Sequence, residues 1–476
     1  MRTDPHTDVL IVGAGPTGLA LGVDLARRGV AALVVEKADG LFPGSRGKGL
    51  QPRTMEVFDD LGVLDAIHEA GGGYPVGMIW QDGERVGEHQ MFEPAEPTEG
   101  SPYDKPWMVP QWRTQEILRA RLAELGGQVA LGRELTGLTQ DADGVTAHFA
   151  TGGDLRARYL VAADGGRSTV RRALGIGMTG DTVDPRPMLV ADIRVRGLDR
   201  ENWHIFPPRG EGEGFLAICP LAGTEDFQMT AQFPEGSTVD VSPDGVRKVV
   251  AARSHLAPSD VTEVRWASDF RPRTALADRF RAGRVLLAGD AAHLHSPAGG
   301  QGLNTSVQDA YNLGWKLGAV LRDEAPAALL DTYEEERRPV AAEMLGLSTS
   351  IHRGEARRGD ATRQLGLGYR ESSLTEETRP TATRVRAGDR APDGPLGGVR
   401  LFDAFRGPHW TLLAVGTEAP EPPKGVRVVQ GGTQTSYGTG LFLVRPDGYV
   451  GWAGDTARGL TEYVTRVGLL PSRARD

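Results

Sequence analysis

The chain has 476 residues, 39% of them hydrophobic and 25% charged, a balance typical of a globular protein with a large core. Its formal net charge of -9 argues against nucleic acid or an anionic membrane as the main partner, because both attract basic surfaces. With one cysteine (Cys219), no apolar leader and no apolar run of about 18 residues, the sequence predicts a cytoplasmic protein without disulfides or membrane spans.

The first segment has the pattern of a βαβ unit. Apolar runs at Val9–Val12 and Ala31–Glu36 predict buried strands, and the spacing of apolar residues in Pro16–Arg28 predicts a helix between them. The turn before this helix reads Gly-Ala-Gly-Pro-Thr-Gly, which brings a pyrophosphate to the helix N-terminus, while an acid after the second strand binds a ribose hydroxyl. A glycine-rich turn in another α/β fold is the alternative. The predicted dinucleotide contacts are Gly13, Gly15, Pro16, Thr17, Gly18, Glu36 and Lys37.

The βαβ unit is not simply repeated further along the chain. Two aromatic-rich and proline-rich stretches, 72–110 and 182–275, predict a separate sheet-rich domain. Further apolar runs predict two more buried strands, and the apolar spacing after residue 301 predicts a long helix. Near the C-terminus two apolar runs and a Pro-Asp-Gly turn predict a third, strand-containing unit. These later elements are strands at Tyr159–Asp164, Arg284–Asp290, Trp410–Val415 and Leu441–Val444, and helices at Gln301–Leu321 and Leu460–Val467.

A second glycine motif favours flavin over nicotinamide. Asp290 follows a buried strand, where its carboxylate can hold a ribityl hydroxyl. The glycine loop and the helix start that follow present N–H groups and a positive dipole to a flat ring, and reduced flavin carries negative charge on one edge. An ordinary strand–turn–helix with a glycine-rich cap is the alternative. The residues predicted to bind here are Gly289, Asp290, Pro297, Gly299, Gly300, Gln301, Gly302, Leu303 and Asn304.

These two motifs and the Asp164-Gly165 segment resemble the three fingerprints of group A FAD-dependent aromatic hydroxylases, which have the para-hydroxybenzoate hydroxylase fold. The resemblance covers residues 8 to about 345 and is strongest to the subgroup of phenol hydroxylase, rifampicin monooxygenases and polyketide hydroxylases. It implies that Asp164 and Gly165 serve both FAD and NADPH. It also implies that Arg46 and Gln111 contact FAD, whereas Arg53 has either this role or a surface or helix-capping one.

The resemblance implies an α/β architecture with three parts. A Rossmann-like FAD-binding domain is formed by residues 1–72, 111–181 and 276–350, and a β-sheet-rich substrate-binding domain by residues 73–110 and 182–275. A helical or mobile linker, 351–389, leads to a thioredoxin-like domain, 390–476. Since that domain lacks the two cysteines of a CxxC motif, it excludes thiol redox chemistry and suggests packing or support of a homodimer.

The implied activity is hydroxylation of a phenolic or polyketide-type ring by NAD(P)H and O2, through a flavin C4a-hydroperoxide near the backbone of Pro297, Gly299 and Gly300. No second glycine fingerprint follows a strand, so NADPH or NADH would bind transiently without its own domain. This absence argues against a Baeyer–Villiger enzyme with two dinucleotide domains. The sequence suggests no metal site.

The substrate side is less defined. No catalytic base is certain: His204 is a weak candidate, and His293 fits a structural role better. Other flavoenzymes on this fold (a reductase, halogenase or dehydrogenase) and a non-catalytic flavin- or ligand-binding protein are the alternatives. The aromatic residues expected to wall the pocket, each of which has plain core packing as its alternative, are Trp80, Trp107, Trp203, Phe206 and Phe270.

Overall fold

The computed structural model describes residues 7–210, 213–322, 325–382 and 384–469, so the outer ends of the first and last predicted domains lie outside it. An eight-stranded sheet forms the centre of the first domain. Its strand β1 (Thr7–Val12) lies between parallel strands β2 (Ala32–Val35) and β11 (Leu155–Ala162), and helix α1 (Pro16–Arg27) connects β1 to β2. The predicted βαβ unit and the mixed α/β class are confirmed.

The remaining elements of this domain cover and extend the sheet. Helix α1 packs between α4 (Gln111–Glu124) and α7 (Gly302–Arg322), and the apolar residues of β1 are buried on both faces of the sheet. The sheet order is β19-β20-β11-β1-β2-β8; β10 also pairs with β11, and β9 pairs with β10. The bounds are β8 Gln128–Ala130, β9 Leu135–Gln140, β10 Val145–Phe149, β19 Arg281–Ala282, β20 Val285–Leu287, α2 Pro52–Leu61, α3 Leu64–Glu69 and α5 Thr169–Ala173.

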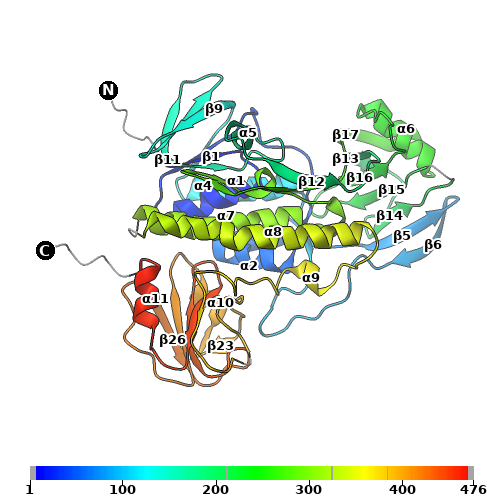
Figure 1. Cartoon of the computed structure of the whole chain (residues 1–476). Coiled ribbons are helices and arrows are strands. Elements are labelled where there is room, and N and C mark those ends of the chain that lie inside the picture. The colour runs from blue at the N-terminus through cyan, green and yellow to red at the C-terminus, as the bar shows by residue number, and fades with distance from the viewer. Residues whose placement is uncertain (1–6, 211–212, 323–324, 383, 470–476) are drawn as a thin grey trace.

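A seven-stranded sheet forms the second domain, at the end of the molecule where α6 lies (Figure 1). Its order is β17-β13-β16-β15-β14-β5-β6, so strands from both sheet-rich stretches of the sequence join in one sheet. One face packs under α6 (Pro243–Arg253), and the other turns toward the first domain, where Gly44 contacts Trp266. The strands are β5 Val76–Gln81, β6 Glu84–His89, β13 Met188–Val195, β14 Asn202–Phe206, β15 Leu216–Pro220, β16 Phe227–Gln232 and β17 Val261–Phe270.

Two small sheets join the two domains. One pairs β7 (Trp107–Met108) with β3 (Gly49–Leu50) and β4 (Gly72–Gly73), and the other pairs β18 (Arg273–Ala277) with β12 (Met178–Thr182) and β21 (His293–Leu294). The two ends of residues 73–110 therefore pair with each other, and β7 also pairs with β3 of the first domain, whereas β5 and β6 between them belong to the second sheet.

The C-terminal domain has a five-stranded sheet below the long helices α7 and α8 (Asp331–His352), which run side by side (Figure 1). The residues between 351 and 389 are not simply a helical or mobile linker, because they contain α9 (Asp360–Arg363) and an edge strand, β22 (Glu376–Glu377), that pairs with β28. The order is β22-β28-β27-β25-β26. The other elements are β23 Pro395–Leu396, β24 Val399–Arg400, β25 Thr411–Val415, β26 Arg427–Gly431, β27 Gly440–Val444, β28 Val450–Gly454, α10 Leu401–Phe405 and α11 Leu460–Arg466.

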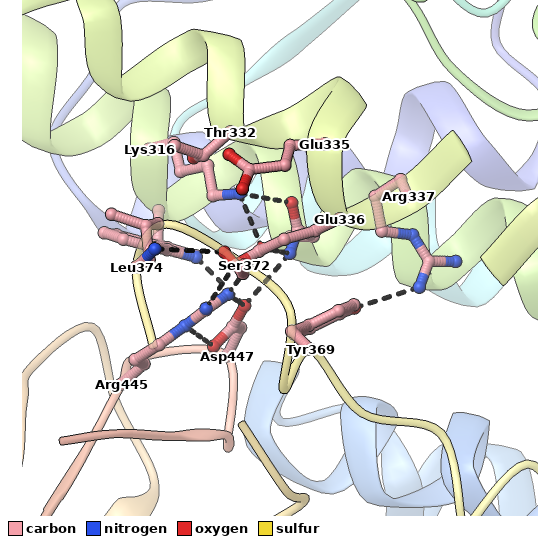
Figure 2. A network of polar contacts seen from close by, with 12 residues as sticks. Lys316, Thr332, Glu335, Glu336, Arg337, Tyr369, Ser372, Leu374, Arg445 and Asp447 are labelled. Carbon is pink, nitrogen blue, oxygen red and sulfur yellow. Dashed lines mark hydrogen bonds and ion pairs between the residues drawn. The ribbon is translucent and has the colours of Figure 1, made fainter. Parts of the chain in front are cut away.

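Buried ion pairs join this domain to α7 and α8 (Figure 2). Arg445 pairs with Glu336 at 2.6 Å and with Asp447 at 2.5 Å, and Lys316 pairs with Glu336 at 2.7 Å. All four side chains are at most 1% exposed. Burial alone would raise the pKa of Glu336, but the two neighbouring cations hold it below its usual range. The junction therefore depends on charges that compensate one another inside the protein.

We expect Glu336→Gln to lower the free energy of unfolding by about 3–5 kcal/mol, because it leaves buried cations without compensation. Glu343→Gln, at an exposed position on the same helix, is the matched control and should change it by less than about 0.5 kcal/mol. Urea unfolding at pH 7 measures both values. Because the folded-state pKa of Glu336 is depressed, the difference should narrow as the pH falls below the ordinary glutamate pKa of about 4.3. Equal midpoints for the two variants at pH 7 would contradict this account.

Candidate cofactor and substrate site

The glycine turn before α1 leaves its backbone accessible to a ligand. Gly13 has φ +110°, and a Cβ there would lie 2.2 Å from the Ala163 carbonyl oxygen, so only glycine fits. A Cβ at Gly15 would meet open space. Helix α1 begins without a side-chain cap or an acid in its first turn, so its N–H groups are free to bind a phosphate. The turn fits a pyrophosphate.

An acid lies beside this turn. One oxygen of Glu36 accepts a hydrogen bond from the Ala14 N–H at 3.0 Å, and the other accepts from Ala38 at 3.1 Å. The exposed Lys37 follows it directly, while Thr17 lies within contact of Gly289, which begins the second glycine motif. The two motifs predicted from the sequence are therefore neighbours in space.

The carboxylates of Asp290 and Asp164 both have an oxygen with no partner among the described residues. Asp290 lies in η2 (Gly289–Ala291), is exposed and makes no hydrogen bond, and the surrounding protein raises its pKa while Arg46 acts against this. Asp164 accepts from the N–H groups of Thr169 at 2.8 Å and Val170 at 3.2 Å through one oxygen, and its other oxygen is buried without a partner. The orphaned oxygen of Asp164 and the accessible carboxylate of Asp290 fit the hydroxyl groups of a bound dinucleotide.

The loop before α7 forms the collar, which we define as residues 297–302. It consists of η3 (Pro297–Gly299), the left-handed Gly300 (φ +64°), Gln301 and the first residue of α7, and the first turn of α7 contains no acid. Gln301 donates to the Gly299 carbonyl at 2.8 Å. Asn304 donates to the carbonyls of Gly300 at 2.8 Å and Gly49 at 2.9 Å, so one amide holds the collar against β3. Free N–H groups at this helix start suit a ring that gains negative charge.

The segment around Arg46 is fixed from two sides. The Gln111 side chain accepts from the Gly47 N–H at 2.9 Å, and the Leu303 side chain lies so close that a Cβ at Gly47 would be 2.9 Å from it. Arg46 itself is exposed, and its guanidinium lies over the rings of Phe42 and Trp266. Gln111 therefore positions this loop beside α7.

The predicted pocket aromatics divide between the two faces of the seven-stranded sheet. Trp203 and Phe270 share the face that turns toward the first domain. Trp80 and Phe206 lie on the opposite face, stacked with centroids 6.0 Å apart in the core under α6, so the expectation that they wall the pocket does not fit their placement. Trp107 packs on α3, where its indole donates to the Ile67 carbonyl at 3.1 Å, and it too lies away from this face.

His204 also lies under α6, and its placement is a correction to its candidacy as a base. It is fully buried, accepts from the Trp80 indole N–H at 3.0 Å and contacts the Asp199 carbonyl at 3.0 Å. Both ring nitrogens are therefore occupied, and burial lowers its pKa. His293 is likewise buried and pairs with Asp309 at 2.5 Å, in keeping with the structural role expected for it.

Arg53 has neither the surface role nor the helix-capping role considered for it, and its contact with FAD stays a prediction. It is buried, pairs with Glu56 at 2.7 Å and donates to the Asp447 carbonyl of the C-terminal domain at 2.8 Å. The sequence reasoning also missed Lys48, Tyr74 and Arg358, which lie between the collar and the inner face of the sheet. No local motif marks them, and only their three-dimensional neighbours single them out.

Comparison with known proteins agrees with this geometry. The family model described as FAD binding domain matches residues 6–348, and the one described as aromatic-ring hydroxylase, C-terminal, matches residues 384–468. The chain belongs to the family of FAD-dependent aromatic-ring monooxygenases. FAD is thus its cofactor, and NAD(P)H is the reductant usual in this family. Within the residues that the structure describes, no helix combines the length and apolarity needed to span a bilayer.

Several known proteins are similar to this chain over nearly its full length. A flavin-dependent monooxygenase of Mycobacteroides abscessus is 47% identical, covering 96% of this chain and 99% of the relative. A rifampicin monooxygenase of Rhodococcus hoagii is 34% identical, covering 94% and 95%. The solved structure of aklavinone-11 hydroxylase with FAD and aklavinone superposes with a TM-score of 0.84 at 30% identity, covering 98% and 99%.

We expect Asp290→Ala to weaken FAD binding roughly 10- to 100-fold, because a hydrogen bond to a charged group contributes about 1.5–3 kcal/mol. Asp143→Ala, at an exposed loop position distant in sequence from Asp290, is the control and should bind FAD like the parent protein. Fluorescence titration of the flavin-free proteins gives both affinities. An unchanged FAD affinity of the Asp290→Ala protein would rule out this role.

Proposed function

We propose that this monooxygenase hydroxylates a flat, polycyclic phenol of the polyketide type, with FAD, O2 and NADPH or NADH. The observation that carries the proposal is the inner face of the seven-stranded sheet, where Trp203, Trp266 and Phe270 present large rings on the side of the first domain. Flat apolar walls favour flat aromatic ligands. Two of the relatives described above act on rifampicin and aklavinone, which supports the same substrate class.

In this proposal the chain's own residues bind and orient both reactants. The glycine turn and Glu36 hold the adenosine end of FAD, Asp290 holds its ribityl chain, and the collar faces its ring. When bound, FAD supplies the redox chemistry with NAD(P)H and O2. The free N–H groups of α7 favour negative charge on the ring, and the sheet closes the opposite side against water. The residues proposed as FAD contacts are otherwise those predicted from the sequence, including Arg46, Gln111, Asp164 and Gly165.

The proposal assigns substrate binding and FAD binding to different domains. Residues 73–110 and 182–275 provide the substrate-binding domain, and residues 1–72, 111–181 and 276–350 bind FAD. A single buried cysteine needs no oxidising compartment, which supports a cytoplasmic location. Formation of a homodimer through the C-terminal domain stays a prediction.

The proposal predicts coupled turnover. The FAD-loaded protein, given NADPH and a panel of polyketide phenols, should oxidise NADPH and consume O2 in proportion to a product that has gained one oxygen atom. Mass spectrometry with labelled O2 identifies that atom, and reactions without substrate or with NADH in place of NADPH serve as controls. A product that gains a halide, or loses hydrogen without gaining oxygen, would refute hydroxylation and point to another reaction on this fold.

A further inference from the structure

Two cations lie between the collar and the inner face of the sheet without an acidic partner. Lys48 precedes β3, and Arg358 lies between α8 and α9. Neither forms an ion pair within 4.0 Å with any carboxylate of the described residues, whereas Lys316 in the C-terminal junction does. Both side chains are half-buried, so each cation loses part of its hydration without gaining a carboxylate in return. Their position calls for a negatively charged ligand.

Lys48 is held by uncharged groups. Its ammonium donates to the Gln228 side-chain oxygen at 2.6 Å and lies 4.3 Å from the centre of the Trp203 ring. The thiol of Cys219 faces the same nitrogen, and Asp192 lies farther away, where its carboxylate accepts from the Ser45 N–H at 2.8 Å. Since an ammonium has three N–H donors, these contacts leave capacity for a further acceptor.

The second cation connects this cluster to the collar. Arg358 donates to the Ala298 carbonyl in η3 at 2.9 Å and lies 5.4 Å from the centre of the Phe92 ring. Tyr74 packs between Phe92 and Trp203, with ring centroids 4.8 Å and 6.2 Å away. The two cations therefore share a wall of three aromatic rings, which suits a flat ligand that carries charge.

One more observation points to a ligand at this place. The indole N–H of Trp203 is buried and has no hydrogen-bond partner among the residues that the structure describes, although buried donors are nearly always paired.

We propose that Lys48 and Arg358 form an anion subsite of the substrate pocket, where they bind the ionised hydroxyl of a phenolic or enolic ring. The proton goes to the neutral form of Lys48, which burial favours: the ring O–H bond breaks, its electron pair stays on oxygen, and an N–H bond forms on Nζ, so that the resulting ammonium pairs with the new oxyanion. The proton remains within the complex and returns to the product oxygen before release. An ionised oxygen enriches the ring carbons ortho and para to it in electrons, which favours their attack on an electrophilic oxygen. The inference rests on the proposed function and narrows its substrate class.

The charges around the amine are consistent with a proton acceptor. Burial lowers the pKa of Lys48, and Arg358 acts in the same direction, while Cys219 and Asp192 act against them. Burial likewise raises the pKa of Cys219, so its thiol stays protonated and supplies no compensating charge. Burial also raises the pKa of Asp192 to about 6.

Emodin, a trihydroxyanthraquinone whose ionised form absorbs at longer wavelength than its neutral form, tests the subsite. The FAD-loaded protein should bind emodin as the anion, with the ratio of ionised to neutral emodin raised roughly tenfold or more, equivalent to a pKa shift of at least about one unit. Lys48→Met should abolish this shift with FAD retained, and Lys48→Arg, which keeps the charge, should preserve it. Lys105→Met, at an exposed lysine outside the cluster, is the control.

Turnover provides the second readout. With a phenol that the enzyme accepts, Lys48→Met should lower kcat roughly 100-fold near neutral pH, and activity should recover as the pH rises through the pKa of the free phenol. Arg358→Met should weaken emodin binding about tenfold without altering FAD content.

The outcomes separate this inference from the proposed function. Emodin bound to the parent protein in its neutral form, failure of the parent protein to bind emodin, or an unchanged spectral shift in Lys48→Met would each overturn the subsite. If Lys48-dependent ionisation is seen but no phenol is hydroxylated, the subsite stands and the proposed function fails. If phenols are hydroxylated and Lys48→Met does not change the rate, the proposed function stands and the subsite fails.

Discussion

Helix α7 is buried along most of its length, so each polar side chain that it directs inward must find a partner within the protein. At its start Asn304 binds Gly49 and Gly300 and so fixes the collar. Farther along, Asp309 accepts from the Gly289 N–H, and near the other end Lys316 pairs with Glu336. A shift of this helix along its axis would unpair all three sites. The same constraint therefore sets the positions of the collar, the Gly-Asp motif and the C-terminal domain.

Asp309 shows how this arrangement reaches the cofactor site. One carboxylate oxygen of Asp309 accepts a hydrogen bond from the Gly289 N–H and contacts Nε2 of His293. The other oxygen accepts from the Arg337 guanidinium at 2.8 Å. Arg337 in turn donates to the Tyr369 hydroxyl at 3.0 Å, in the segment that leads to the C-terminal domain. The strand end that carries Asp290 is thus supported by a chain of buried contacts from another part of the molecule. A C-terminal domain without redox cysteines can in this way affect flavin binding by packing alone.

The FAD side of the fold could be predicted from the sequence because its signals are local. The glycine turn at residues 13–18 and the long helix, predicted at Gln301–Leu321 and found at Gly302–Arg322, need only neighbouring residues to specify them. The substrate side could not, because the alternation of a strand shows which residues share a face but not which face is inward. Trp80 and Trp203 illustrate this, since both are aromatic strand residues and only the packing of α6 separates them. Arg53 and β22 depend on partners hundreds or dozens of residues away, for which no local pattern exists.

The inward-facing cations of this protein differ in whether a carboxylate compensates their charge. At the C-terminal junction, Lys316 and Arg445 are matched by Glu336 and Asp447, as the desolvation of buried charge requires. On the inner face of the sheet, Lys48 has an amide oxygen and an aromatic face, which offset only part of that desolvation. A carboxylate placed beside it would stabilise the empty protein and, for the same reason, would occupy the position that an anionic ligand needs. Stability and ligand binding are therefore opposed at this face, and an unmatched cation in an acidic protein is retained where binding outweighs stability.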